Sequence, residues 1–292
     1  MSGNRTAPDR RSFLRAGAAT ALGLAGLPAL SAAEDKPSDD FGGFLLGAQS
    51  YTFRDFNTEQ ALKQMKDLGL HYAEFYQKHA PDNSTPAQVK ALLKLCKEYE
   101  VTPRAWGVQG FTKNHDENRK YFEFGKALGI KMLSADPNPD SFDSLDKLCE
   151  EYKIAIGIHP HGPAGGGRLH RWYSAEVIMK AVKDHNPLIG SCLDTGHLIR
   201  AAQLGKKLDP AEQIRVMGPR NFGLHLKDHD NAKKTDVVIG KGALDVVALL
   251  KALRDVKFKG LISIEYEAHA DNPSPDVRAC VAVFKESVKK LA

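Results

Sequence analysis

Four polar segments close apolar, strand-like runs of this chain: Ile158-His159-Pro160-His161, Leu193-Asp194-Thr195-Gly196-His197, Leu224-His225-Leu226-Lys227-Asp228 and Ile264-Glu265-Tyr266-Glu267. If these runs are parallel strands, their carboxyl ends meet at one rim and bring distant imidazoles and carboxylates together. Imidazole nitrogen mixed with carboxylate oxygen suits a divalent ion such as Mn²⁺, Zn²⁺ or Co²⁺. The sequence therefore predicts a metal site at one end of a parallel sheet or barrel.

The rest of the chain repeats the same alternation of strand and helix. Apolar runs that predict strands cover residues 45–50, 72–76, 102–108, 131–135, 154–159, 189–194, 222–226 and 261–265. Helical patterns follow them at residues 58–68, 86–99, 117–128, 141–152, 174–185, 211–217, 243–256 and 275–291. Parallel strands need crossover connections, and helices supply them. Eight such units predict an α/β fold, a single (β/α)8 TIM barrel over residues 44–292.

An open, doubly wound sheet is the competing fold. It is disfavoured because no glycine-rich turn follows the first strand, where a dinucleotide fingerprint would stand. The glycine-rich stretch 162–167 follows the fifth strand instead and lacks the lysine of a phosphate loop. We expect it to be a mobile loop at the rim, beside a ligand or simply in solvent.

The N-terminus resembles an export signal. Asp9-Arg10-Arg11-Ser12-Phe13-Leu14-Arg15 is a twin-arginine pattern, an apolar stretch follows at residues 16–30, and Ser31-Ala32-Ala33 offers small residues for cleavage. The apolar stretch is shorter than the roughly 20 residues of a membrane span and rich in Ala and Gly. We expect a signal peptide at residues 1–33, a flexible mature N-terminus at 34–43, and a periplasmic or secreted enzyme. An uncleaved N-terminal anchor is the alternative.

Net charge limits the classes of partner that we expect, and the spacing of the cysteines predicts the state of their thiols. Without residues 1–33 the chain keeps 37 Lys and Arg against 35 Asp and Glu, a net charge of +2. Such a balance disfavours nucleic acid as a partner, and stable membrane insertion after processing is not expected. The four widely spaced cysteines form no CxxC pair and are expected to be buried free thiols. The oligomeric state stays open, a homo-oligomer included.

Strand periodicity selects the metal ligands. Alternate residues of a strand face the same side, and Asp194, His225 and Glu265 each directly follow an apolar residue at a strand end. Three ligands from neighbouring strands and a fourth from the fifth strand would form a compact site. Such a site stays open to substrate on one side, as catalytic metals require.

The quoted segments resemble the motifs of the xylose isomerase-like barrel superfamily, which includes ketose 3-epimerases, hydroxypyruvate isomerases and inosose dehydratases. The Asp-Thr-Gly-His and His-Leu-Lys-Asp segments are the most specific parts, and the similarity continues to Gly240-Lys241-Gly242. The resemblance implies a carbohydrate substrate. It also implies that Asp194, His225 and Glu265 bind a divalent metal.

The same resemblance suggests substrate contacts. It places His197 and Lys227 near substrate oxygens. Glu74, at the end of the second strand, occupies a position where these families often have a glutamate, so it is a candidate for substrate binding. Its alternative is a buried carboxylate held by a neighbouring cation.

The fifth strand departs from the epimerase pattern. Epimerases of the superfamily typically carry a glutamate there that is both ligand and base, whereas this chain has His159 or, as the alternative ligand, His161. The His-Pro-His version is more similar to the inosose dehydratase branch. Proton transfer between two faces of a carbon is easiest with two bases, whereas elimination needs one base and one acid. Glu265 is the clear carboxylate base, and His159, His161 or Lys227 would assist it.

Three functions follow from these residues. The leading one is a metal-dependent sugar isomerase or epimerase. A dehydratase or lyase acting on keto-sugars or keto-glycosides is the second, and a non-catalytic periplasmic sugar-binding protein is the third. A related barrel group that cleaves DNA at abasic sites is disfavoured by the near-neutral mature charge.

Aromatic residues are expected to shape the sugar site. Trp106, with Phe53 and Trp172, would form an apolar wall for a sugar ring, or would instead pack in the core. Lys241 between two glycines is a weak phosphate signal, and an exported enzyme is expected to meet unphosphorylated sugars.

Overall fold

The computed structural model of the chain describes Met1 and residues 39–291. Apart from Met1, the expected signal peptide lies outside the described residues, as does the segment 34–38. None of the described helices combines the length and hydropathy of a membrane span. The expectation of a flexible segment reaching residue 43 needs correction, because η1 (Asp39–Phe41) is a 3-10 helix. Phe41 is buried, with its ring centroid 6.0 Å from that of Phe284.

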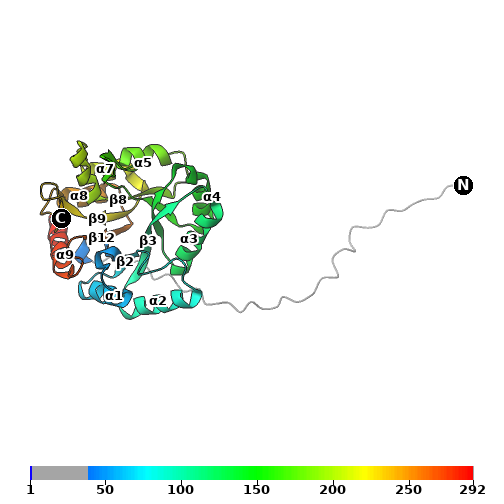
Figure 1. Cartoon of the computed structure of the whole chain (residues 1–292), viewed down its shortest axis with the longest axis horizontal. Coiled ribbons are helices and arrows are strands. Elements are labelled where there is room, and N and C mark those ends of the chain that lie inside the picture. The colour runs from blue at the N-terminus through cyan, green and yellow to red at the C-terminus, as the bar shows by residue number, and fades with distance from the viewer. Residues whose placement is uncertain (2–38, 292) are drawn as a thin grey trace. The chain divides into compact units, whose positions relative to one another are not determined.

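Eight parallel strands close into a barrel, as expected (Figure 1). They are β1 (Leu45–Gln49), β2 (Tyr72–Phe75), β3 (Thr102–Phe111), β4 (Met132–Pro137), β5 (Ala155–Ile158), β8 (Ile189–Asp194), β9 (Asn221–Leu226) and β12 (Leu261–Ile264). Their order around the barrel is β1-β12-β9-β8-β5-β4-β3-β2, and β1 pairs with β12 from Leu45 opposite Leu261. The predicted (β/α)8 TIM barrel is therefore confirmed.

Helices cover the outside of the barrel. They are α1 (Thr58–Asp67), α2 (Pro86–Glu98), α3 (His115–Leu128), α4 (Phe142–Tyr152), α5 (Ala175–Val182), α6 (Thr195–Arg200), α7 (Pro210–Met217), α8 (Val246–Asp255) and α9 (Ser274–Lys289). Local sequence fixes several of their ends: Asn57 and Thr85 form capping boxes with the glutamines three residues later, and Gly129 ends α3 in the left-handed conformation. The expected helices are confirmed, with boundaries shifted by one to a few residues.

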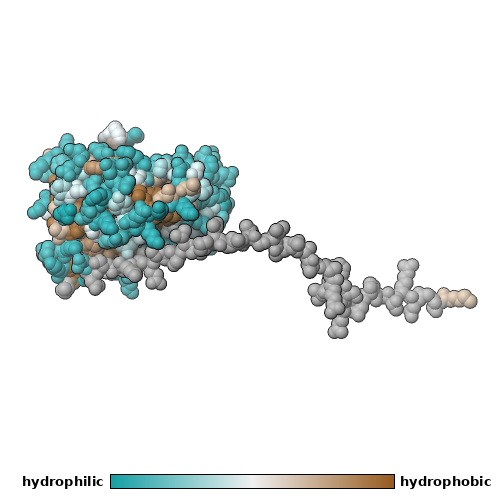
Figure 2. Space-filling view, turned by 90° about the horizontal axis from the view of Figure 1, so that it is seen from below, coloured by the Kyte–Doolittle hydropathy of each residue, from teal (hydrophilic) through white to brown (hydrophobic). Residues whose placement is uncertain are grey.

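The barrel strands are buried on both faces. Every residue of β1, β5, β8 and β12 is buried. Strands enclosed by helices outside and side chains inside read as continuous apolar runs, which is why they were recognisable in the sequence. The outer surface is different: the face drawn in Figure 2 is mainly hydrophilic, with small hydrophobic areas between polar side chains.

Short elements at the rim were not expected. The stretch expected to be a mobile loop contains a hairpin of β6 (Pro163–Ala164) and β7 (Arg168–Leu169). A second hairpin joins β10 (Asp228–Asp230) to β11 (Thr235–Val237), and α6 starts directly at the end of β8. Strands of two or three residues are too short to show an alternation of apolar and polar residues in the sequence. The remaining 3-10 turns are η2 (Ser50–Phe53), η3 (Pro139–Ser141), η4 (Ala201–Leu204) and η5 (Gly218–Arg220).

Candidate metal centre

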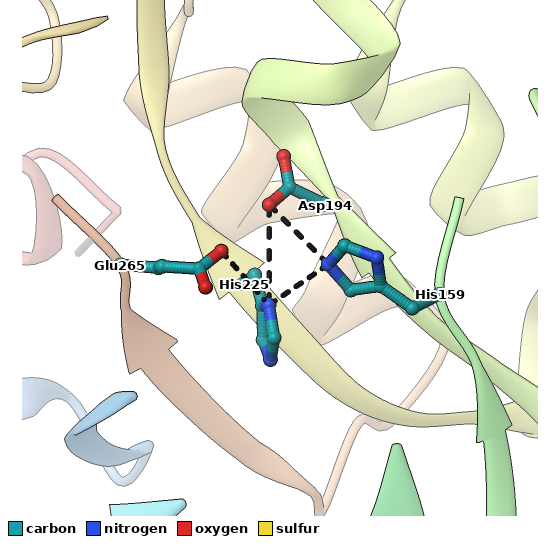
Figure 3. Close-up of side chains that lie close together, drawn as sticks. All are labelled: His159, Asp194, His225 and Glu265. Carbon is teal, nitrogen blue, oxygen red and sulfur yellow. Dashed lines mark hydrogen bonds and ion pairs between the residues drawn. The ribbon is translucent and has the colours of Figure 1, made fainter. Parts of the chain in front are cut away.

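Four side chains from neighbouring strand ends converge at one point (Figure 3). They are His159 after β5, Asp194 at the end of β8, His225 in β9 and Glu265 after β12. Nε2 of His159 lies 3.0 Å from Nδ1 of His225 and 3.5 Å from Oδ2 of Asp194. Nδ1 of His225 lies 3.1 Å from Oε2 of Glu265 and 3.9 Å from Oδ2 of Asp194. All four residues are buried, and one ligand atom from each lies within 4.8 Å of the others.

These separations fit a single divalent ion. Ligands at about 2.0–2.2 Å from a metal stand roughly 3–4.4 Å apart from one another. Oδ2 of Asp194 is buried and takes part in no hydrogen bond, although Nζ of Lys227 lies 3.2 Å away. The Lys227 ammonium offsets the charge of this oxygen, and the oxygen keeps lone pairs that no hydrogen-bond donor uses and that a metal ion could accept. Two imidazoles and two carboxylates are also a normal donor set for Mn²⁺, Zn²⁺ or Co²⁺.

Asp194 has two separate tasks. Its Oδ1 accepts a hydrogen bond from the backbone N–H of His197 at 2.6 Å, which caps the N-terminus of α6. Its Oδ2 is thereby aimed at His159 and His225. One residue thus ends β8, starts α6 and contributes to the cluster.

Glu74 contacts the ring nitrogen of His225 that faces away from the other three side chains. Its Oε2 lies 2.9 Å from Nε2 of His225 and accepts a hydrogen bond from Ser263 at 3.2 Å, while Ser134 donates to its Oε1. Such a partner orients the ring and directs Nδ1 toward the other three side chains. Glu74 is fully buried and does not line the pocket at the barrel mouth. The expected substrate contact of Glu74 is therefore corrected: it is a positioning residue for His225.

Charged neighbours keep the cluster ionised. Burial alone raises the pKa of Asp194 and of Glu265, but the Lys227 ammonium and nearby imidazoles hold the pKa of both carboxyls below their usual range. Burial lowers the pKa of His225, yet Cys192, Glu74 and Glu265 together raise it well above its ordinary value. The two carboxylates are therefore available as anionic ligands.

Lys227 lies among three carboxylates. Its buried Nζ is 2.8 Å from Oε2 of Glu265 and 3.2 Å from Oδ2 of Asp194, and it also contacts Oε1 of Glu267. Burial lowers the pKa of Lys227, but these carboxylates raise it well above its ordinary value. The hydroxyl of Thr195 accepts a hydrogen bond from the Lys227 backbone N–H at 2.9 Å and so fixes the end of β9. Glu267 had no role in the sequence-based site; its place two residues after Glu265 was the available signal.

Gly196 leaves room for the stem of Lys227. A Cβ at position 196 would lie 2.6 Å from Cγ and 2.9 Å from Cβ of Lys227. We expect Gly196→Ala to displace the ammonium and destabilise the fold by about 1–3 kcal/mol. Thermal unfolding would measure the loss of stability. Gly165→Ala is the matched control, because its Cβ meets no atom within 4 Å; equal effects of the two substitutions would refute the role assigned to Gly196.

The remaining histidines face the mouth as neutral rings. Nδ1 of His197 accepts a hydrogen bond from the backbone N–H of Gly162 at 3.2 Å, so Nε2 carries the proton. Burial holds the pKa of His197 well below its ordinary value. Burial, with the charges of His159 and His170, lowers the pKa of His161 to about 3. The structure places His159, rather than His161, beside Asp194 and His225.

A pocket of about 400 Å³ opens over the cluster. Its lining residues are Gln49, Tyr51, Tyr76, Gln77, Gly107, Val108, His159, His161, His197, Glu265 and Glu267. A cavity of about 450 Å³ at the amino ends of the strands contains no cluster residue. Active sites of TIM barrels lie at the carboxyl ends of the strands, so the first pocket is the relevant one.

The expected aromatic wall is corrected. Trp106 packs against Tyr121 and Phe124, and its Nε1 donates to the Ala80 carbonyl at 2.9 Å, outside the pocket. Phe53 and Trp172 are likewise buried and absent from the lining. These three residues pack in the core, as the alternative interpretation of the sequence predicts.

A family model for the xylose isomerase-like TIM barrel matches residues 62–287. The chain belongs to the xylose isomerase-like TIM barrel family. An uncharacterized protein of Methanocaldococcus jannaschii is 28% identical over 134 residues, which are 44% of this chain and 43% of that protein. The chain thus matches less than half the length of that curated relative.

Several solved structures share the fold of this chain. An uncharacterized protein of Parabacteroides distasonis has a TM-score of 0.64 and 28% identity, over 85% of this chain and 99% of that one. The 3-keto-D-glucoside 4-epimerase of E. coli has a TM-score of 0.65 and 15% identity, over 83% and 99%. A Bacillus anthracis protein named "probable 3-DHS dehydratase" has a TM-score of 0.65 and 12% identity, over 82% and 97%. These two likenesses show that proteins named as an epimerase and as a dehydratase have the same barrel fold as this chain.

Proposed function

We propose that this chain is a metal-dependent enzyme that removes a proton from the carbon next to a sugar carbonyl, acting as a sugar isomerase or epimerase. The convergence of four ligand-type side chains beneath an open pocket carries this proposal. His159, Asp194, His225 and Glu265 would hold the ion. A bound divalent ion polarises a carbonyl oxygen and stabilises the negative charge that develops as the proton leaves.

The protein's own groups divide the remaining work. Glu265 lines the pocket and is the base, and Lys227, 2.8 Å from its Oε2, keeps it ionised. His197 presents an N–H to the pocket and would donate a hydrogen bond to a substrate oxygen. Lys227 does not line the pocket, so it would act as a positioning residue through its ion pair with Glu265.

The pocket favours a neutral sugar. Among the described residues that line it, two are glutamates and none is lysine or arginine. A phosphate group would meet two carboxylates and no basic side chain in this lining, which costs free energy. The carbohydrate name of the E. coli neighbour also supports an unphosphorylated keto-sugar or keto-glycoside.

A lyase that eliminates water from a keto-sugar or keto-glycoside is the second candidate. The observation that favours it is His159, an imidazole where a second carboxylate base would serve epimerisation. Elimination needs one base and one acid, which this site offers. For either reaction we propose export through the twin-arginine signal at residues 1–33.

Deuterium exchange separates the candidates. The purified mature protein would be incubated in D₂O with Mn²⁺ and a panel of ketoses and 3-keto-glycosides, and followed by NMR. We expect metal-dependent deuterium incorporation next to the carbonyl. An epimer or isomer as product supports the leading function, and an unsaturated carbonyl supports the lyase. Tight binding of a sugar without exchange at any carbon would contradict both and identify a binding protein.

A further inference from the structure

Exposed apolar side chains gather at the pocket. Among the described residues, the large hydrophobic side chains that are exposed are Met1, Tyr51 at 37%, Val108 at 38% and Val216 at 38%. Two of these four, Tyr51 and Val108, line the pocket over the metal cluster. Apolar surface kept in contact with water at a binding site indicates that a ligand covers it.

The topology puts these residues opposite the metal ligands. The strands β12, β9, β8 and β5 are consecutive around the barrel, and they lead to the four ligand-type residues. Tyr51 follows β1, Tyr76 follows β2 and Val108 belongs to β3, and these strands form another consecutive arc. The mouth is therefore divided into a half that carries the ligand-type side chains and a half, called the apolar half below, that carries Tyr51 and Val108 beside Gln49 and Gln77.

Contacts with Arg54 fix the two tyrosines of the apolar half in the ligand-free protein. The guanidinium carbon of Arg54 lies 4.9 Å from the centroid of the Tyr51 ring, and the edge of Tyr76 meets that ring at 5.3 Å. Nη2 of Arg54 donates to the Glu267 carbonyl at 2.5 Å, and the Tyr76 hydroxyl donates to the Arg54 carbonyl at 3.4 Å. A rigid aromatic surface binds a flat ligand face with little loss of side-chain entropy.

We infer that Tyr51 and Val108 form a subsite for the aglycone of a keto-glycoside, with a second ring, aromatic or sugar, lying on Tyr51. This inference rests on the proposed function, because the keto-sugar ring is taken to lie over the cluster. A ligand that engages both arcs must reach across the mouth, and a glycosidic substituent provides that reach. A sugar or aryl ring also has an apolar face that can pack on the exposed part of the Tyr51 ring.

The experiment compares methyl and phenyl 3-keto-β-D-glucopyranoside. Rates of deuterium incorporation would give kcat/KM for both, in the Mn²⁺-loaded wild type and its variants. Binding of phenyl β-D-glucopyranoside, which has no keto group, would be measured by calorimetry as a readout independent of turnover. Tyr51→Ala and Val108→Ser test the subsite, and Tyr51→Phe retains the ring. Val216→Ser is the matched control, equally exposed but outside the pocket.

We expect the wild type to prefer the phenyl glycoside by about tenfold. Tyr51→Ala should abolish that preference and weaken binding of the phenyl glucoside. Val108→Ser should reduce the preference for the phenyl glycoside, and Tyr51→Phe and Val216→Ser should keep this preference. Equal kcat/KM for both glycosides in the wild type, or an unchanged preference in Tyr51→Ala, would overturn the subsite. Absence of exchange with every substrate would instead count against the proposed function, and the calorimetry would still decide the subsite.

Discussion

Asp194→Asn is expected to release the divalent ion and to lower turnover by at least about 100-fold, since even residues that only support a ligand affect metal sites by about 10- to 100-fold. The amide keeps an oxygen that can cap α6, because Asn serves as well as Asp at this position. It removes the charge from Oδ2, the oxygen that points to His159 and His225. The loss of metal should therefore occur in a folded protein. Metal content per chain and the D₂O exchange rate measure the two effects.

Asp245→Asn is the matched control. Asp245 caps α8 through the backbone N–H of Ala248 at 2.9 Å and lies outside the cluster. The Asp245→Asn variant should keep full metal content and turnover. Stoichiometric metal in Asp194→Asn, or equal losses in both variants, would reject Asp194 as a ligand.

Lys227→Met is expected to destabilise the metal-free protein by about 3–5 kcal/mol, because it leaves buried carboxylates without their cation. At about 2–4 °C per kcal/mol for a domain of this size, the melting temperature should fall clearly. Asp194, Glu265 and Glu267 are the carboxylates concerned. A divalent ion compensates the first two, so added Mn²⁺ should raise the melting temperature more in the variant than in the wild type.

Lys285→Met provides the comparison for this effect. Lys285 pairs with Asp40 at the surface, where ion pairs contribute about 0–1 kcal/mol. The melting temperature of the Lys285→Met variant and its response to Mn²⁺ should match those of the wild type. An equally stable Lys227→Met protein with a normal response to metal would show that the three carboxylates do not depend on this ammonium.

The barrel and the cluster were predictable for the same reason. Strands buried on both faces must be continuously apolar, so a polar residue directly after such a run marks the rim. Asp194, His225 and Glu265 follow this pattern, and the structure places them beside His159. Their role as metal ligands stays a prediction.

The pocket wall was not predictable in this way. Trp106 and Val108 lie two residues apart in β3, yet the tryptophan packs among helix residues and the valine lines the pocket. Which side a strand residue faces near a bulge depends on the register, and the register between β3 and β4 shifts between Trp106 and Gln109. Tyr51 lies in a 3-10 turn, where no periodicity assigns a face. Size and aromaticity therefore pointed to Trp106, and three-dimensional packing decided otherwise.

Anomalous diffraction from crystals of the mature protein grown with Mn²⁺ tests the central claim most directly. The account predicts one strong peak at the carboxyl ends of the strands, about 2.0–2.3 Å from one atom each of His159, Asp194, His225 and Glu265. A map with no peak among these four side chains, or a cation bound elsewhere on the barrel, would contradict it.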